Sequence, residues 1–147
     1  MEAIELYMME RANGMPVGRA QWIVGNRLLR GFQVEKNEDE AEKWFLRAWD
    51  NRFPGTANTQ AFVLTRKWLR YINAKFSKTP RLLSLLTKAS ISSDEKNGTI
   101  LLPVFNDAQE KWIDSKLQEI RDSFRGYTEG YYSNITIDVT RTNKNND

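Results

Sequence analysis

The sequence predicts an α+β protein, with a helical first part and a second part that combines helices with three short strands. Apolar residues recur at the three- and four-residue spacing of amphipathic helices from Ile4 to Phe76. Two segments at 88–92 and 99–105, the second mostly apolar, flank a polar turn and are expected to be strands. A third segment, "ITIDVT", alternates apolar and polar residues as a half-buried strand does. The 147 residues are 40% hydrophobic and 28% charged, a composition typical of one ordinary domain or of two small units sharing a core.

Three helices are expected before residue 52. The first spans 2–12, and the second spans 18–30 and ends at Gly31, as helices commonly do. The third begins near Asn37, whose side chain can cap the helix, with acidic residues directly after it that favour the helix dipole. Its expected buried stripe consists of Ala41, Trp44, Phe45, Ala48 and Trp49. The turn-rich segment 52–58 is the expected boundary, which gives a helical domain at 1–56 and an α+β domain at 59–142.

The second domain is expected to contain helix, short helix, strand, strand, helix and strand. The first helix spans 59–76 with Trp68 in the core, and the short helix at 81–86 follows a proline at its first position. Strands at 88–92 and 99–105 are joined with Asn97-Gly98 as the tight corner. A helix at 106–124, capped by Asn106 and anchored on the sheet by Trp112, precedes the last strand at 135–139. Residues 143–147 are expected to be a disordered tail.

The absent residue types exclude several classes of function. The chain has no histidine and no cysteine, so structural zinc sites, Ser-His triads and thiol chemistry are excluded. Neither common glycine-rich phosphate-binding motif occurs. We therefore expect a protein that is not an enzyme and that needs no metal and no cofactor. The N-terminus lacks the basic segment of a signal peptide and no stretch is long and apolar enough to span a bilayer, so we expect a cytoplasmic protein with no membrane contact.

The positive charge is distributed unevenly. The net charge is only +3, yet no acidic residue lies between Asp50 and Asp94. Eight basic residues do: Arg52, Arg66, Lys67, Arg70, Lys75, Lys78, Arg81 and Lys88. Such a segment indicates either a surface that meets phosphates or acidic groups, or simply the solvated face of a basic helix.

The helical domain resembles a single Sel-one-like repeat, a helical hairpin related to the TPR. The resemblance rests on residues 20–51, "AQWIVGNRLLRGFQVEKNEDEAEKWFLRAWDN". Small residues at Ala20 and Gly25 allow close helix packing, Gly31 ends the first helix, and the pattern from Glu40 to Ala48 forms the second. Because one repeat cannot bury its own apolar face, the hairpin is expected to pack on the rest of the chain.

The α+β domain resembles the N-terminal domain of the bacterial initiator DnaA and the related C-terminal domain of the DNA polymerase III tau subunit. The shared pattern is a tight turn, an apolar strand, an asparagine, and a helix with Trp-Ile followed by a leucine. Here it falls on Asn97-Gly98, Ile100 to Val104, Asn106, Trp112-Ile113 and Leu117. The resemblance implies a small KH-like module with three strands, and a function in docking other proteins.

The expected function is therefore that of a protein–protein interaction adaptor linked to bacterial DNA replication, with an initiator, a helicase or a polymerase as partner. An interface of this kind needs a few aromatic or polar anchors. The candidate partner-binding residues are Phe105, Gln109, Trp112, Lys116, Tyr131 and Tyr132.

Two alternatives remain open at this point. The chain could bind nucleic acid, with Tyr71 near the bases and phosphates contacted by Arg66, Lys67, Arg70, Lys75, Lys78 and Arg81. It could also be a phage or mobile-element protein that mimics a host module to inhibit or redirect a host protein. The sequence does not determine the oligomeric state.

Overall fold

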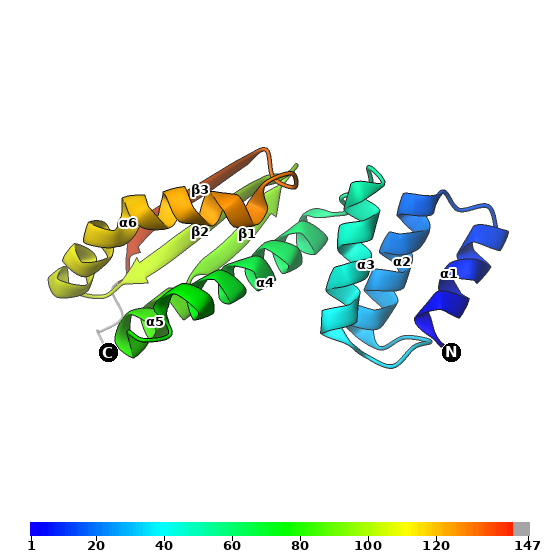
Figure 1. Ribbon diagram of the computed structural model, residues 1–147, viewed down its shortest axis with the longest axis horizontal. Coiled ribbons are helices and arrows are strands. Elements are labelled where there is room, and N and C mark those ends of the chain that lie inside the picture. The colour runs from blue at the N-terminus through cyan, green and yellow to red at the C-terminus, as the bar shows by residue number, and fades with distance from the viewer. Residues whose placement is uncertain (143–147) are drawn as a thin grey trace. The chain divides into compact units, whose positions relative to one another are not determined.

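The computed structural model describes residues 1–142, and the expected disordered tail lies outside this range. The predicted α+β class is confirmed: the described residues form six helices and one three-stranded sheet, with most helices N-terminal and the strands C-terminal (Figure 1). In chain order the elements are α1 (Ala3–Ala12), α2 (Val17–Arg30), α3 (Glu38–Asp50), α4 (Ala57–Phe76), α5 (Pro80–Thr87), β1 (Ser90–Asp94), β2 (Asn97–Val104), α6 (Asp107–Thr128) and β3 (Asn134–Arg141).

The chain divides into two compact units, with the division between Val63 and Leu64 inside α4. The sequence pattern placed the boundary earlier, in the turn-rich segment at 52–58. That segment does separate α3 from α4, but the first turns of α4 belong to the N-terminal unit. Trp22 shows this locally, because its indole nitrogen donates a hydrogen bond of 2.9 Å to the Thr59 hydroxyl on α4.

The core of the N-terminal unit lies between α2 and α3. The expected stripe of α3 is buried throughout, and Ala20 of α2 is completely buried. A side chain at Gly25 would place its Cβ 2.5 Å from the Phe45 ring, so the glycine permits the close approach of the two helices. The predicted ends are also correct: Gly31 adopts the left-handed conformation after α2, and the Asn37 side chain accepts a hydrogen bond of 3.0 Å from the Glu40 amide.

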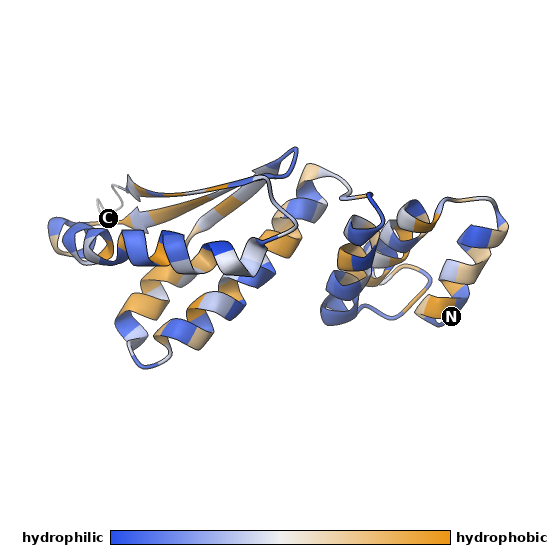
Figure 2. Ribbon diagram, turned by 45° about the horizontal axis from the view of Figure 1, so that its top comes forward, coloured by the Kyte–Doolittle hydropathy of each residue, from blue (hydrophilic) through white to orange (hydrophobic). Residues whose placement is uncertain are grey.

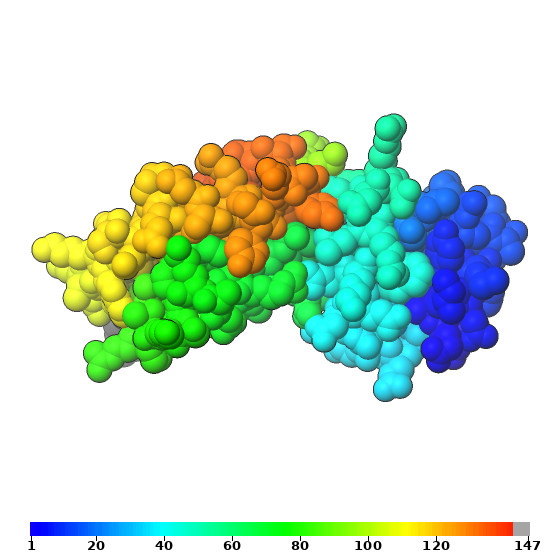
Figure 3. All heavy atoms as spheres, in the orientation of Figure 1, coloured from blue at the N-terminus to red at the C-terminus, as the bar shows by residue number. Residues whose placement is uncertain are grey.

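The C-terminal unit has two layers, with α4 and α6 side by side on one face of the sheet (Figures 1 and 3). β2 is the central strand, antiparallel to β1 and parallel to β3. Alternate residues of β2 are buried beneath the helices: Gly98, Ile100, Leu102 and Val104. α6 presents a mainly hydrophilic outer surface (Figure 2), while Ile113, Ile120 and Phe124 point into the core. Trp68 of α4 is completely buried, as predicted, and meets Phe124 edge to face with 5.1 Å between ring centroids.

The predicted hairpin exists, but its corner was placed wrongly. The register pairs Asp94 with Asn97, so the two-residue turn consists of Glu95 and Lys96, both with positive φ angles. Gly98 lies within β2 instead, where a Cβ would be 2.6 Å from the Leu64 side chain and 2.7 Å from that of Ile135. The glycine is therefore not part of the turn, and a side chain at this position would have to displace the terminal methyl groups of Leu64 and Ile135. Other bounds also shift. β1 begins at Ser90 and α6 continues to Thr128, each later than predicted, and β3 extends beyond the predicted strand at both ends.

We expect the Gly25→Ala substitution to lower the free energy of unfolding by about 1–3 kcal/mol, because the added methyl group overlaps a ring that is itself in the core. Urea unfolding followed by circular dichroism measures this change. Gly126→Ala is the matched control, since nothing lies within 4 Å of its Cβ on α6. Alanine there should raise stability by about 0.5–1 kcal/mol. Equal stability of Gly25→Ala and wild type would contradict the close packing of α2 on α3.

Candidate docking site

A groove runs between α5 and the first turns of α6 in the C-terminal unit, and it has a volume of about 580 Å³. The residues that line it are Arg81, Ser84, Leu85, Lys88, Asn106, Ala108, Gln109 and Trp112. We call it the α5–α6 groove. It contains two of the predicted partner-binding residues, Gln109 and Trp112, together with Arg81 from the predicted basic set.

The α5 side of the groove is fixed by the core beneath it. Pro80 occupies the first turn of α5, where a missing N–H costs nothing. Leu82, Leu85 and Leu86 point inward and are buried. The indole nitrogen of Trp68 donates a hydrogen bond of 3.0 Å to the Leu86 carbonyl oxygen, which ties α5 to α4. Arg81 and Ser84 consequently face outward on a helix that is held in place.

The α6 side is fixed by hydrogen bonds at the helix start. The Asn106 side chain accepts a hydrogen bond of 2.9 Å from the Gln109 amide, which confirms the predicted cap. In return, the Gln109 side-chain oxygen accepts one of 2.7 Å from the Phe105 backbone N–H. Gln109 therefore stabilises the junction between β2 and α6. The sequence predicted Gln109 only as a partner-binding residue, and this structural role was not expected.

Trp112 packs against the core, as predicted, but its side chain is not enclosed there. It is only partly buried and lines the groove, whereas its neighbour Ile113 is completely buried. Successive residues on a helix are about 100° apart, so Trp112 lies at the edge of the apolar stripe. The indole packs against the core on one side and is accessible from the groove on the other.

The groove has a positive rim. Within residues 1–142, Arg81 makes no ion pair or hydrogen bond, and the Lys88 ammonium lies 5.6 Å from the centroid of the Phe105 ring. The nearby carboxylates of α6 are already paired: the Arg141 guanidinium is 3.0 Å from Asp107 and 2.8 Å from Glu110. These hydrogen bonds, first that to Asp107, raise the pKa of Arg141 above its ordinary value. Among the described residues, the cations of α5 are thus left without a carboxylate partner.

The other predicted partner-binding residues lie elsewhere. Lys116 is partly buried one turn beyond Trp112 on α6. Tyr131 and Tyr132 follow the far end of this 22-residue helix, roughly 30 Å from its start at 1.5 Å per residue. The Lys67 ammonium lies 4.7 Å from the centroid of the Tyr131 ring. The six residues therefore do not form one surface.

The predicted basic set is also divided among several surroundings. Lys75 forms an ion pair of 2.9 Å with Glu119 on α6, which raises the pKa of Lys75 and lowers that of Glu119. Lys67 lies over Tyr131 and Arg81 lines the groove. Arg66 is partly buried, and Arg70 and Lys78 are exposed. Tyr71 was expected near nucleic-acid bases, but it is 2% exposed and its hydroxyl is hydrogen-bonded to Ser123, so its ring cannot stack on a base.

The contribution of α5 to the groove is not among the predictions from the sequence. Ser84, Leu85 and Lys88 line the groove without being predicted site residues, although the spacing of the buried leucines indicates that Ser84 and Lys88 face outward. Within residues 1–142 no helix is long and apolar enough to cross a membrane. In the same range no three Asp or Glu side chains come together as metal ligands.

The burial of Tyr71 predicts a specific pH dependence. Burial raises its pKa above the ordinary value of 10.0, so the folded state keeps the hydroxyl proton at a pH where the unfolded state releases it. Stability should therefore fall more steeply above pH 10 in wild type than in Tyr71→Phe. At pH 7 the variant should be about 1 kcal/mol less stable, because the hydrogen bond to Ser123 is lost. Urea unfolding at several pH values between neutral and alkaline tests this, and a stability gap that stays constant with pH would contradict it.

We compared the chain with protein-family models, with curated proteins and with solved structures, and it matches none of them. The resemblances to a Sel-one-like repeat and to the DnaA and tau domains therefore stay predictions from the residues quoted above. A function is therefore inferred from the geometry and chemistry of the protein's surfaces.

Proposed function

We propose that this protein is a non-enzymatic adaptor of the cytoplasm that binds another protein through the α5–α6 groove. The observation that supports the proposal most directly is the combination, in one groove, of a partly buried tryptophan and an arginine with no carboxylate partner within residues 1–142. Tryptophan and arginine are the residues most enriched among those that dominate protein–protein binding energy.

The groove is also suited to binding because its walls are preorganised. α5 is attached to α4 through Trp68, and the start of α6 is capped by Asn106. Little conformational entropy would be lost from these backbone segments when a partner binds, and that loss is a major cost of association. Leu85 also lines the groove, although its side chain is mostly buried in the core beneath it.

We further propose that the partner is a component of bacterial DNA replication: an initiator, a helicase or a polymerase subunit. This part of the proposal rests on the strand, asparagine and Trp-Ile pattern from Ile100 to Leu117, and on the similarity of that pattern to the DnaA and tau domains. A native adaptor and a mimic of a host module would use the same groove, so the proposal applies to either.

The Ala108→Arg substitution should abolish binding without affecting the fold. Ala108 is exposed in the first turn of α6 and lines the groove, so an arginine there would fill it. The measurement is capture of proteins by the tagged full-length chain from a lysate of the organism that encodes it, with identification by mass spectrometry. We expect wild type to recover a replication component and the variant to lose about tenfold or more of that recovery, or 1.4 kcal/mol for each factor of ten.

Gln118→Arg is the matched control, because it adds the same charge at an exposed position of α6 outside the groove. It should retain capture. If wild type recovers no initiator, helicase or polymerase component, the replication part of the proposal is wrong. If both variants capture the same partner as well as wild type does, the groove is not the docking site.

A further inference from the structure

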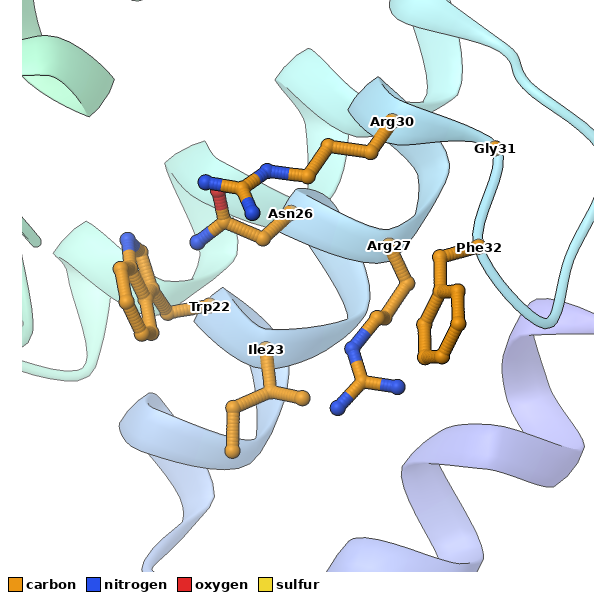
Figure 4. Close-up of a pocket in the computed structure, with 7 residues that line it drawn as sticks. All are labelled: Trp22, Ile23, Asn26, Arg27, Arg30, Gly31 and Phe32. Carbon is orange, nitrogen blue, oxygen red and sulfur yellow. The ribbon is translucent and has the colours of Figure 1, made fainter.

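A second surface with unbalanced positive charge lies on the outer side of α2, in the N-terminal unit (Figure 4). It is a shallow depression of about 630 Å³. The residues that line it are Trp22, Ile23, Asn26, Arg27, Arg30, Gly31 and Phe32. We call it the α2 face. Because it shares no residue with the α5–α6 groove, binding at the α2 face is independent of the function proposed for that groove.

The α2 face has cations without carboxylates. α2 contains three arginines and no acidic residue. Within residues 1–142, Arg30 has neither a hydrogen bond nor an ion pair, and Figure 4 shows its side chain extended back along the helix beside Asn26. Arg27 donates a hydrogen bond to the Gln33 side chain, a neutral group that leaves its charge unbalanced.

The face also exposes an aromatic ring that the fold holds at the surface. Phe32 is 58% exposed, the most exposed aromatic side chain of the described residues. Gly31 turns the chain with a φ of 73°, and the Phe32 N–H donates a hydrogen bond of 3.0 Å to the Arg27 carbonyl oxygen. The guanidinium of Arg27 then lies 4.9 Å from the centroid of the Phe32 ring. Figure 4 shows the two side chains next to each other. An exposed ring in a defined position contributes little to folding, but it suits contact with a partner.

The apolar side of the depression is equally well fixed. Trp22 is held by its hydrogen bond to Thr59 and by contact with Phe53, with 5.5 Å between ring centroids. Ile23 is partly buried next to it. The face therefore combines apolar surface from Trp22 and Ile23 with two arginines, one helical turn apart in the chain, whose guanidinium groups can donate hydrogen bonds to an anionic partner.

The charge of the surrounding unit favours a protein partner over nucleic acid. Residues 1–63 contain eight basic and nine acidic side chains. A nucleic-acid backbone repeats its negative charge at every nucleotide, and a unit whose side-chain charges nearly balance offers no extended positive surface for it beyond the α2 face. A short segment with one or two carboxylates next to an apolar side chain places its negative charge only where the arginines are.

We propose that the α2 face binds an acidic segment of a partner protein, with an apolar side chain over Ile23 and Trp22 and carboxylates on Arg27 and Arg30. Bidentate pairing would fix the carboxylates, since guanidinium groups match them in geometry. The Phe32 ring lies next to Arg27, and it would contact the partner's apolar side chain there. Affinity should decrease as salt is raised, because the arginines are at the surface.

The test is selection of a random displayed peptide library on the full-length chain, followed by binding of the enriched peptides, resynthesised, to purified variants. Enriched peptides should contain Asp or Glu next to a Leu, Ile or Phe. Their affinity should fall about tenfold or more for Arg30→Glu, which reverses the charge at the face. It should also fall for Phe32→Ser, an exposed position whose substitution leaves the core intact.

Arg19→Glu is the matched control, because it makes the same charge change on α2 at an exposed residue that does not line the depression. It should change affinity by less than about threefold, since exposed charges act weakly at a distance in salt. The proposal is wrong if no peptide is enriched above the display background, or if the enriched peptides are basic or uncharged. It is also wrong if Arg19→Glu and Arg30→Glu lose affinity equally. A fourth contradicting result is that the wild-type chain retains a single-stranded oligonucleotide and Arg30→Glu abolishes that retention. Circular dichroism of each variant establishes that the fold is retained.

Discussion

Parallel pairing between β2 and β3 is the constraint on which the C-terminal unit depends. Parallel neighbours cannot be joined by a hairpin, so the chain must cross over the sheet, and α6 is that crossover. A helix in this position must bury one side, which Ile113, Ile120 and Phe124 do against the sheet and α4. The antiparallel pairing of β1 then fixes α5, because Ser90 at the start of β1 lies opposite Leu101, close to the end of β2. The end of α5 and the start of α6 are therefore brought to the same edge, and the α5–α6 groove is a consequence of strand register.

The same topology explains why the groove is positive. β3 ends at the edge where α6 begins, so Arg141 reaches both Asp107 and Glu110 in the first turn of α6. Arg141, and no cation of α5, is thus the ion-pair partner of these two carboxylates. Within residues 1–142, Arg81 and Lys88 have no carboxylate partner; Arg81 lines the groove with Trp112, and Lys88 lies near the Phe105 ring. Which cation is paired depends on where β3 ends, and it could not be inferred from the net charge of the segment.

Local signals in the sequence predicted most of the elements, because their causes are local. Asn37 and Asn106 cap helices, and Gly31 ends one, by interactions within a few residues. Predictions were wrong where contacts between residues far apart in the chain determine the position of a residue. Asn97-Gly98 has the strongest short signal for a hairpin turn, yet Gly98 lies within β2 and packs against Leu64 and Ile135, far away in the chain. Tyr71 looked available because it lies in a basic segment, but its ring belongs to the cluster with Trp68 and Phe124. The α5–α6 groove could not be predicted because it depends on the register of the strands, and no local sequence pattern determines that register.

The two proposed surfaces share one chemical feature, although they lie in different units and use different elements. In each, an arginine has no carboxylate partner within the described residues and an accessible aromatic ring is fixed by neighbouring hydrogen bonds or packing. Folding gains little from either arrangement, since an unpaired surface cation and an exposed ring contribute almost nothing to stability. Binding gains from both, because the fixed geometry reduces the entropy lost when a partner is ordered on it. The two surfaces share no lining residue, so the occupants that we propose for them do not compete for the same side chains, as the proposed adaptor function needs.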